Sequence, residues 1–76
     1  MKKFTREERE INEELKEEGF GLYMTATEVA KAIGKTHPQQ GRDFMEGCAE
    51  WRFGNKSRVT YARADVVRQM ALCKVN

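Results

Sequence analysis

The apolar positions near the start of the chain predict one narrow amphipathic helix, from Phe4 to Gly19. Thr5 and Glu8 have the spacing of a capping box at its beginning, and glycine commonly follows a helix end. Ile11 and Leu15 lie on one side, while most other positions are charged. So narrow a stripe can pack against the edge of a neighbour, but it cannot form a core by itself.

A second amphipathic pattern predicts a helix from about Ala26 to Ile33. Thr25 and Glu28 form another capping box, and Gly34 suits the left-handed conformation that ends many helices. Residues 20–24 are short, apolar and aromatic, which is typical of a single strand or an extended lead-in. The face expected to be buried consists of Ala26, Val29, Ala30 and Ile33.

A third helix is predicted from about His37 to Glu46, and a short turn separates it from the second. Thr36 and Gln39 have the spacing of a capping box, and Pro38 falls in the first turn, where its missing N–H costs little. Gly41 lies in the middle, where it either permits a close approach to helix two or to a phosphate, or is a tolerated weak point. The residues expected to be buried are Phe44, Met45 and Cys48. Two helices joined by a tight turn are typical of a helix-turn-helix.

Polar and apolar residues alternate between Trp51 and Arg63, which predicts a β-hairpin with Gly54-Asn55 in its turn. One face would pack its large side chains on the core: Trp51, Phe53, Val59 and Tyr61. The other would carry Arg52, Arg58 and Thr60, with Lys56 at the tip.

The last apolar pattern predicts a helix from about Arg63 to Cys73 that buries Val66, Val67, Met70 and Cys73. The expected fold class is therefore mainly α with a small β-hairpin (α+β), in the order of a winged helix-turn-helix. We expect a charged N-terminal helix in residues 1–19 and the winged helix-turn-helix domain in residues 20–76.

The charge of this 76-residue chain is nearly balanced at +2, but it is unevenly distributed. Residues 1–18 hold five Lys or Arg against seven Glu, a net charge of −2, whereas residues 19–76 hold nine basic against five acidic residues, a net charge of +4. From Trp51 to Arg63 there are four basic residues and no acidic one. Such a basic segment favours an anionic partner over a merely solubilising surface.

The sequence lacks the residues that several functional classes need. The sequence shows no paired nucleophile and base, no phosphate-binding glycine loop and no metal-ligand spacing, so we expect neither an enzyme nor a cofactor. The N-terminus lacks the apolar region of a signal peptide, and no apolar run approaches membrane length. We expect a cytoplasmic protein that has no membrane partner and whose two cysteines, Cys48 and Cys73, are reduced and partly buried.

Residues 22–70 resemble the excisionase-like, MerR-related winged helix-turn-helix proteins of phages and mobile elements. The matching segments are TATEVAKAIG in the first helix of the pair, the polar second helix that ends at Gly47, WRFGNKSRVTYAR in the hairpin and ADVVRQM after it. The resemblance implies that the protein binds double-stranded DNA, with the 37–46 helix in the major groove and the 51–63 hairpin on the backbone or minor groove. Among excisionases it also implies DNA bending and assistance to a recombinase, and the protein is expected to be either excisionase-like or a transcriptional regulator.

By position, the resemblance places two sets of residues on DNA. The set expected in the major groove is Thr36, His37, Gln39, Gln40 and Arg42, and the set on the wing is Arg52, Asn55, Lys56, Ser57 and Arg58. Glutamine can pair with adenine, and arginine with guanine or with phosphate.

The same fold is also compatible with a second function. The protein would then be a protein–protein interaction adaptor without autonomous DNA binding, acting through its acidic N-terminal helix or its last helix. Possible partners are a recombinase or, by self-association through the N-terminal helix, a second copy of the chain.

Overall fold

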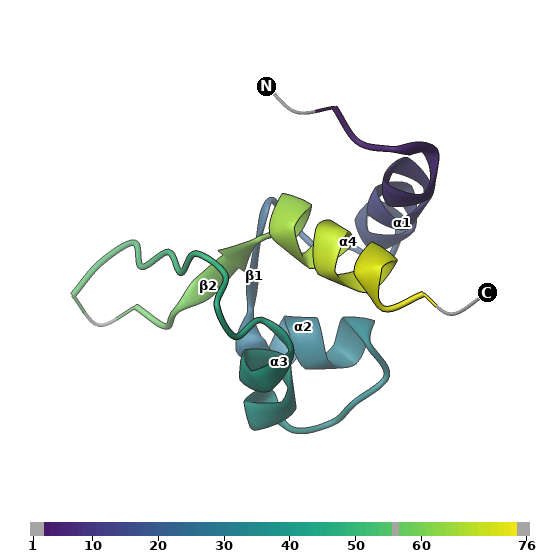
Figure 1. Cartoon of the computed structure of the whole chain (residues 1–76). Coiled ribbons are helices and arrows are strands. Elements are labelled where there is room, and N and C mark those ends of the chain that lie inside the picture. Colours follow the sequence, from purple (N-terminus) through teal and green to yellow (C-terminus); the bar gives the residue numbers. More distant parts are fainter. Residues whose placement is uncertain (1–2, 56, 75–76) are drawn as a thin grey trace.

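The computed structural model describes residues 3–55 and 57–74, which form four helices and a two-stranded antiparallel sheet (Figure 1). The helices lie at one end of the molecule, and residues 51–55 and 57–59, which we call the 51–59 segment, extend away from them (Figure 1). The elements are α1 (Arg6–Glu17), β1 (Tyr23–Thr25), α2 (Ala26–Ala32), α3 (Pro38–Phe44), β2 (Thr60–Ala62) and α4 (Arg63–Leu72). The predicted α+β class, mainly helical, is confirmed.

The sheet is built from segments that are far apart in the sequence. Strand β1 pairs with β2 in the register Tyr23↔Ala62, Met24↔Tyr61 and Thr25↔Thr60. On the other side of β2, Trp51 and Thr60 exchange two backbone hydrogen bonds of 2.8 Å. The predicted hairpin is therefore present as a single bridge at its base. Its upper part, residues 52–55 and 57–59, has no ladder pairing.

The register at this bridge places the Trp51 side of the hairpin on the face opposite to the predicted one, while Val59 and Tyr61 face the core as predicted. Residues directly opposite each other in an antiparallel pair share a face, so Trp51 lies on the face of Thr60. Tyr61 points to the other face and is only 2% exposed, in the core. Trp51 and Phe53 are 42% and 61% exposed, so their predicted burial is wrong. A change of one residue in register is enough to move both side chains to the outer face.

Two of the three predicted capping boxes are confirmed. At α1 the Thr5 hydroxyl accepts from the Glu8 amide at 3.2 Å, and the Glu8 carboxylate accepts from the Thr5 amide at 2.8 Å. At α2 Thr25 and Glu28 make the same pair of bonds, at 3.2 and 3.0 Å. These bonds satisfy backbone donors that a helix N-terminus leaves free, and they fix where each helix begins.

The third box is displaced by one residue. His37, and not Thr36, caps α3: its Nδ1 accepts from the Gln39 amide at 3.3 Å, and the Gln40 side chain accepts from the His37 amide at 3.2 Å. Pro38 explains the shift, because it occupies the first helical position and the cap must directly precede it.

The core lies between the helices and one face of the sheet. Its buried side chains come from every element except α3, whose C-cap residue Met45 contributes: Leu15, Met24, Ala26, Val29, Met45, Tyr61, Val66 and Val67. Phe44 and Cys48 are partly buried against this cluster. Both thiols are free, and Cys73 is exposed, contrary to its predicted burial.

Gly41 allows α3 to pack directly on the backbone of α2. It is buried, and a Cβ atom at this position would overlap the carbonyl oxygen of Ala26 and lie 3.1 Å from the Ala30 nitrogen. Of the alternatives that the sequence leaves open for Gly41, the structure therefore shows close approach to helix two.

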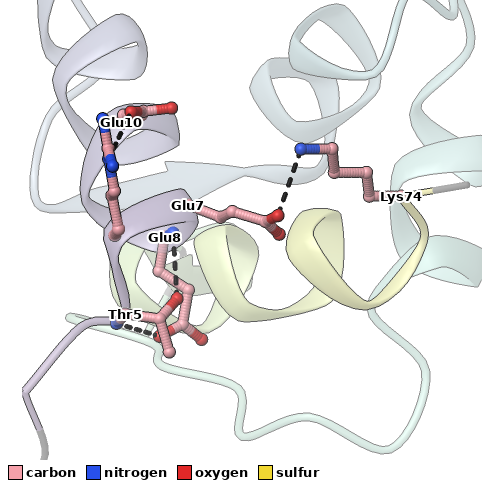
Figure 2. Close-up of polar contacts among 6 residues, drawn as sticks. Thr5, Glu7, Glu8, Glu10 and Lys74 are labelled. Atoms are coloured by element: carbon pink, nitrogen blue, oxygen red, sulfur yellow. Dashed lines mark hydrogen bonds and ion pairs between the residues drawn. The ribbon is translucent and has the colours of Figure 1, made fainter. Parts of the chain in front are cut away.

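Helix α1 packs on α4 and joins the common core through Leu15. Arg63, at the start of α4, donates to the Asn12 side chain at 2.9 Å and to the Phe20 carbonyl at 3.1 Å. Lys74, after the other end of α4, pairs with Glu7 at 3.1 Å (Figure 2). Arg63 therefore holds the N-terminal helix in place, although the sequence counts it among the basic residues of the hairpin.

We predict that Gly41→Ala destabilises the fold by about 1–3 kcal/mol, because the added methyl group forces α3 away from α2. Gly21→Ala is the matched control, since a Cβ there meets nothing within 4 Å. Urea unfolding followed by circular dichroism measures both variants. Equal stability of the two variants would contradict the close packing.

We predict that stability falls above pH 10 in a way that depends on Tyr61. Burial, and secondarily the nearby Glu50 carboxylate, raises the pKa of Tyr61 above its usual 10.0. The unfolded chain then loses this proton first, so unfolding becomes easier as pH rises, by at most about 1.4 kcal/mol per pH unit. Urea midpoints between pH 9 and 11 should fall less for Tyr61→Phe than for the unaltered protein. Parallel curves would show that Tyr61 does not contribute.

Candidate nucleic-acid interface

Three arginines from two separate segments line one open groove. Arg42 comes from α3, and Arg52 and Arg58 come from the two sides of the extended 51–59 segment. The groove has a volume of about 470 Å³ and runs along the beginning of α2. Its other lining residues are Thr25, Ala26, Thr27, Pro38 and Val59.

The groove is positively charged because three arginines and no carboxylate line it. Within residues 3–55 and 57–74, none of the three arginines forms an ion pair. Like charges gathered on one surface repel each other, and an anion that binds among them relieves this repulsion. A guanidinium group can also donate two parallel hydrogen bonds to a phosphate. The groove therefore has the charge and the donors of a phosphate-binding surface.

The exposed side of α3 carries a small polar network beside the groove. The Gln39 side chain donates to the Asp43 carboxylate at 2.9 Å and accepts from Arg42 at 3.3 Å. All three residues are exposed. Asp43 thus holds Gln39 in place, and Gln39 in turn positions the Arg42 guanidinium.

The remaining residues predicted on α3 have local roles. His37 and Gln40 are exposed, and each uses one side-chain acceptor to cap the helix. Gln40 keeps its NH₂ group as a donor for other partners. Thr36 is exposed and precedes the cap, and it does not line the groove.

The tip of the 51–59 segment is a turn in which the Ser57 amide donates to the Gly54 carbonyl at 3.2 Å. Asn55 and Ser57 are exposed there. The prediction for Lys56 falls outside the described residues. Of the nine predicted site residues that the structure describes, Arg42, Arg52 and Arg58 are therefore the three that the groove brings together.

Sequence reasoning missed two features of this surface. Thr25 and Thr27 line the groove, since the start of α2 forms one of its walls. The aromatic side chains of Tyr23, Trp51 and Phe53 form a second, exposed cluster that does not line the groove. Trp51 and Phe53 belong to the alternating pattern, but only the register at Thr60 shows that they lie on the outer face.

Comparison of the chain with protein-family models, curated proteins and solved structures finds no match. No helix in the described part of the chain has the length and apolar character to cross a membrane. Among the same residues, no group of three or more His, Cys, Asp or Glu side chains is arranged to hold a metal ion.

We predict that Trp51→Ala costs no more than about 1.5 kcal/mol of stability, the contribution of an exposed aromatic pair. A tryptophan in the core would cost about 3–5 kcal/mol. Met24→Ala, in the same sheet but fully buried, should cost about 2–5 kcal/mol. Thermal and urea unfolding of both variants measure the difference. A larger loss for Trp51→Ala than for Met24→Ala would contradict the observed register.

Proposed function

We propose that the protein is a winged helix-turn-helix protein that binds double-stranded DNA. The observation that carries the proposal is the groove in which Arg42 of α3 meets Arg52 and Arg58 of the 51–59 segment without an opposing carboxylate. A helix and an adjacent basic extension are the two parts that such a protein lays on a duplex.

In this arrangement α3 enters the major groove and the 51–59 segment lies along the neighbouring backbone. Arg52 and Arg58 bind phosphates and orient the protein, which adds affinity but little sequence information. Gln39 and Arg42 contact base edges, because their side chains are exposed and carry the donors that recognise adenine and guanine. Asp43 lies next to these groups, so its carboxylate disfavours a backbone contact on its side of α3.

The packing of α3 supports this role because it fixes the helix before DNA arrives. The contact at Gly41 holds α3 against α2, and the cap at His37 fixes its first turn. A preformed recognition surface loses less conformational entropy on binding than a flexible one. The resemblance to excisionase-like proteins adds a biological role, either assistance to a recombinase or regulation of transcription.

Fluorescence anisotropy with a labelled duplex of mixed sequence tests the proposal. Binding should weaken steeply as salt rises, because cations are released from the phosphates. Arg58→Ala should weaken binding to all sequences and lower the slope of log K against log salt by about 0.9, the value for one lost phosphate contact. Arg9→Ala, which removes the same charge from the exposed surface of α1, is the control and should change neither quantity.

Two results would overturn the proposal. The first is the absence of salt-sensitive binding at high micromolar protein. The second is an equal loss for Arg9→Ala and Arg58→Ala, which would show that net charge alone, and not the groove, governs binding.

One observation favours an adaptor as the second candidate function. An open groove of about 790 Å³ lies between α1, α2 and α4, with the apolar side chains of Ile11, Leu15 and Met70 on its lining. Three glutamates, Glu14, Glu17 and Glu18, outnumber one lysine, Lys31, on the lining of the same groove, and within the described residues none of the four forms an ion pair. This combination suits a basic amphipathic segment of a protein partner.

A further inference from the structure

Three aromatic side chains, which we call the aromatic cluster, pack on one another outside the core, on the outer face of the sheet. The ring centroids of Tyr23 and Phe53 are 4.8 Å apart, and those of Tyr23 and Trp51 are 5.6 Å apart. The Trp51 and Phe53 rings are nearly parallel, at 10°, with centroids 6.3 Å apart. All three side chains are nevertheless exposed.

The aromatic cluster adjoins the groove of the three arginines, which we call the arginine groove. Thr25, which lines this groove, lies two positions after Tyr23 in β1, so the two side chains share the outer face of the sheet. An extended chain that leaves the groove past Thr25 therefore reaches the rings on the same face. Because residues 51–63 contain no acidic side chain, an occupant of this surface that carries negative charge is favoured.

We infer that the aromatic cluster stacks on unpaired nucleobases of a DNA strand whose backbone is bound by Arg52 and Arg58 of the arginine groove. This inference rests on the proposed DNA binding. Paired bases present only their edges in the grooves of a duplex, whereas an unpaired base presents its whole face to a ring. The protein then binds a duplex that continues into a single strand more tightly than a fully paired duplex.

The geometry of the cluster suits this task. The ring of Tyr23 packs at 66° to Phe53 and at 58° to Trp51, so it contacts both of the other rings. Tyr23 is itself fixed by its pairing with Ala62 in the sheet. The exposed rings are thus positioned before a base arrives, which reduces the entropy lost on stacking. Stacking tolerates any base, so the preference is for unpaired structure and not for a sequence.

The test compares a blunt duplex with the same duplex extended by a single-stranded run of thymidines. The extended duplex should bind about fivefold tighter or more, the effect of stacking at least one base on an aromatic ring. Trp51 is the only tryptophan, so its emission reports directly on the cluster and should be quenched by the extended duplex but not by the blunt one.

Three variants separate stacking from charge. Phe53→Leu keeps an apolar side chain without a ring, so it should lose the preference for the extended duplex and keep the affinity for the blunt one. Phe53→Tyr keeps a ring and should retain the preference. Arg58→Ala should weaken binding to both duplexes by a similar factor. Thermal unfolding checks that each variant is folded.

Each contrary result has a distinct meaning. Equal affinity for the two duplexes, with unchanged Trp51 emission, overturns the inference and leaves the proposed function standing. Failure to bind either duplex overturns both. A shift of Trp51 emission with protein concentration in the absence of DNA shows that a second copy covers the cluster, and this also overturns the inference.

Discussion

The contact between Gly41 and the backbone of α2 is the constraint on which the rest of the site depends. Because no side chain separates the two helices at this point, α3 lies close against the Ala26 carbonyl, at the first turn of α2. Arg42 follows in the next position of α3 and lies at the same end of α2. The residue that permits the packing thus also decides where the cation of α3 is presented.

Thr25 connects this helix pair to the sheet. Its hydroxyl caps α2, and its backbone is paired with Thr60 in β2. Thr60 in turn holds Trp51 by two backbone hydrogen bonds, while its hydroxyl donates to the Trp51 carbonyl at 2.8 Å. The base of the 51–59 segment is therefore attached, through three consecutive contacts, to the start of α2. This chain of contacts explains why Arg52 and Arg58 meet Arg42, although they are distant from it in the sequence.

Local signals were sufficient for the helices but not for the sheet. The capping boxes at Thr5 and Thr25, and the glycine-containing ends of these two helices, depend on hydrogen bonds between residues three to five positions apart, so the local sequence contains their determinants. Gly34 fulfils its prediction in this way: its amide and that of Lys35 bond to carbonyls in the last turn of α2, at 3.1 and 2.7 Å.

The sheet depends on partners from distant segments. No local sequence pattern indicates that β1 pairs with β2. This pairing decides on which face of the sheet the alternating residues after Glu50 lie. Arg63 likewise bonds to Asn12, fifty-one positions earlier, and nothing in the acid-free run from Trp51 distinguishes it from the exposed arginines. The three arginines of the groove were therefore all among the predicted cations, but the sequence did not show that they lie together or that Arg63 lies elsewhere.

In the part of the chain that the structure describes, the outer face of the sheet is uncovered because the chain is too short to supply a further layer. Met24 and Tyr61 fill the inner face against the helices, and within the described residues no element covers the outer one. A face that meets only water favours polar residues, as Thr25 and Thr60 illustrate, and folding alone gives no reason to place Trp51 and Phe53 beside them. Exposed aromatic groups of this kind are typical of binding surfaces. Because Thr25 lines the groove and shares this face with Tyr23, the aromatic cluster adjoins the groove for which we propose an anionic ligand.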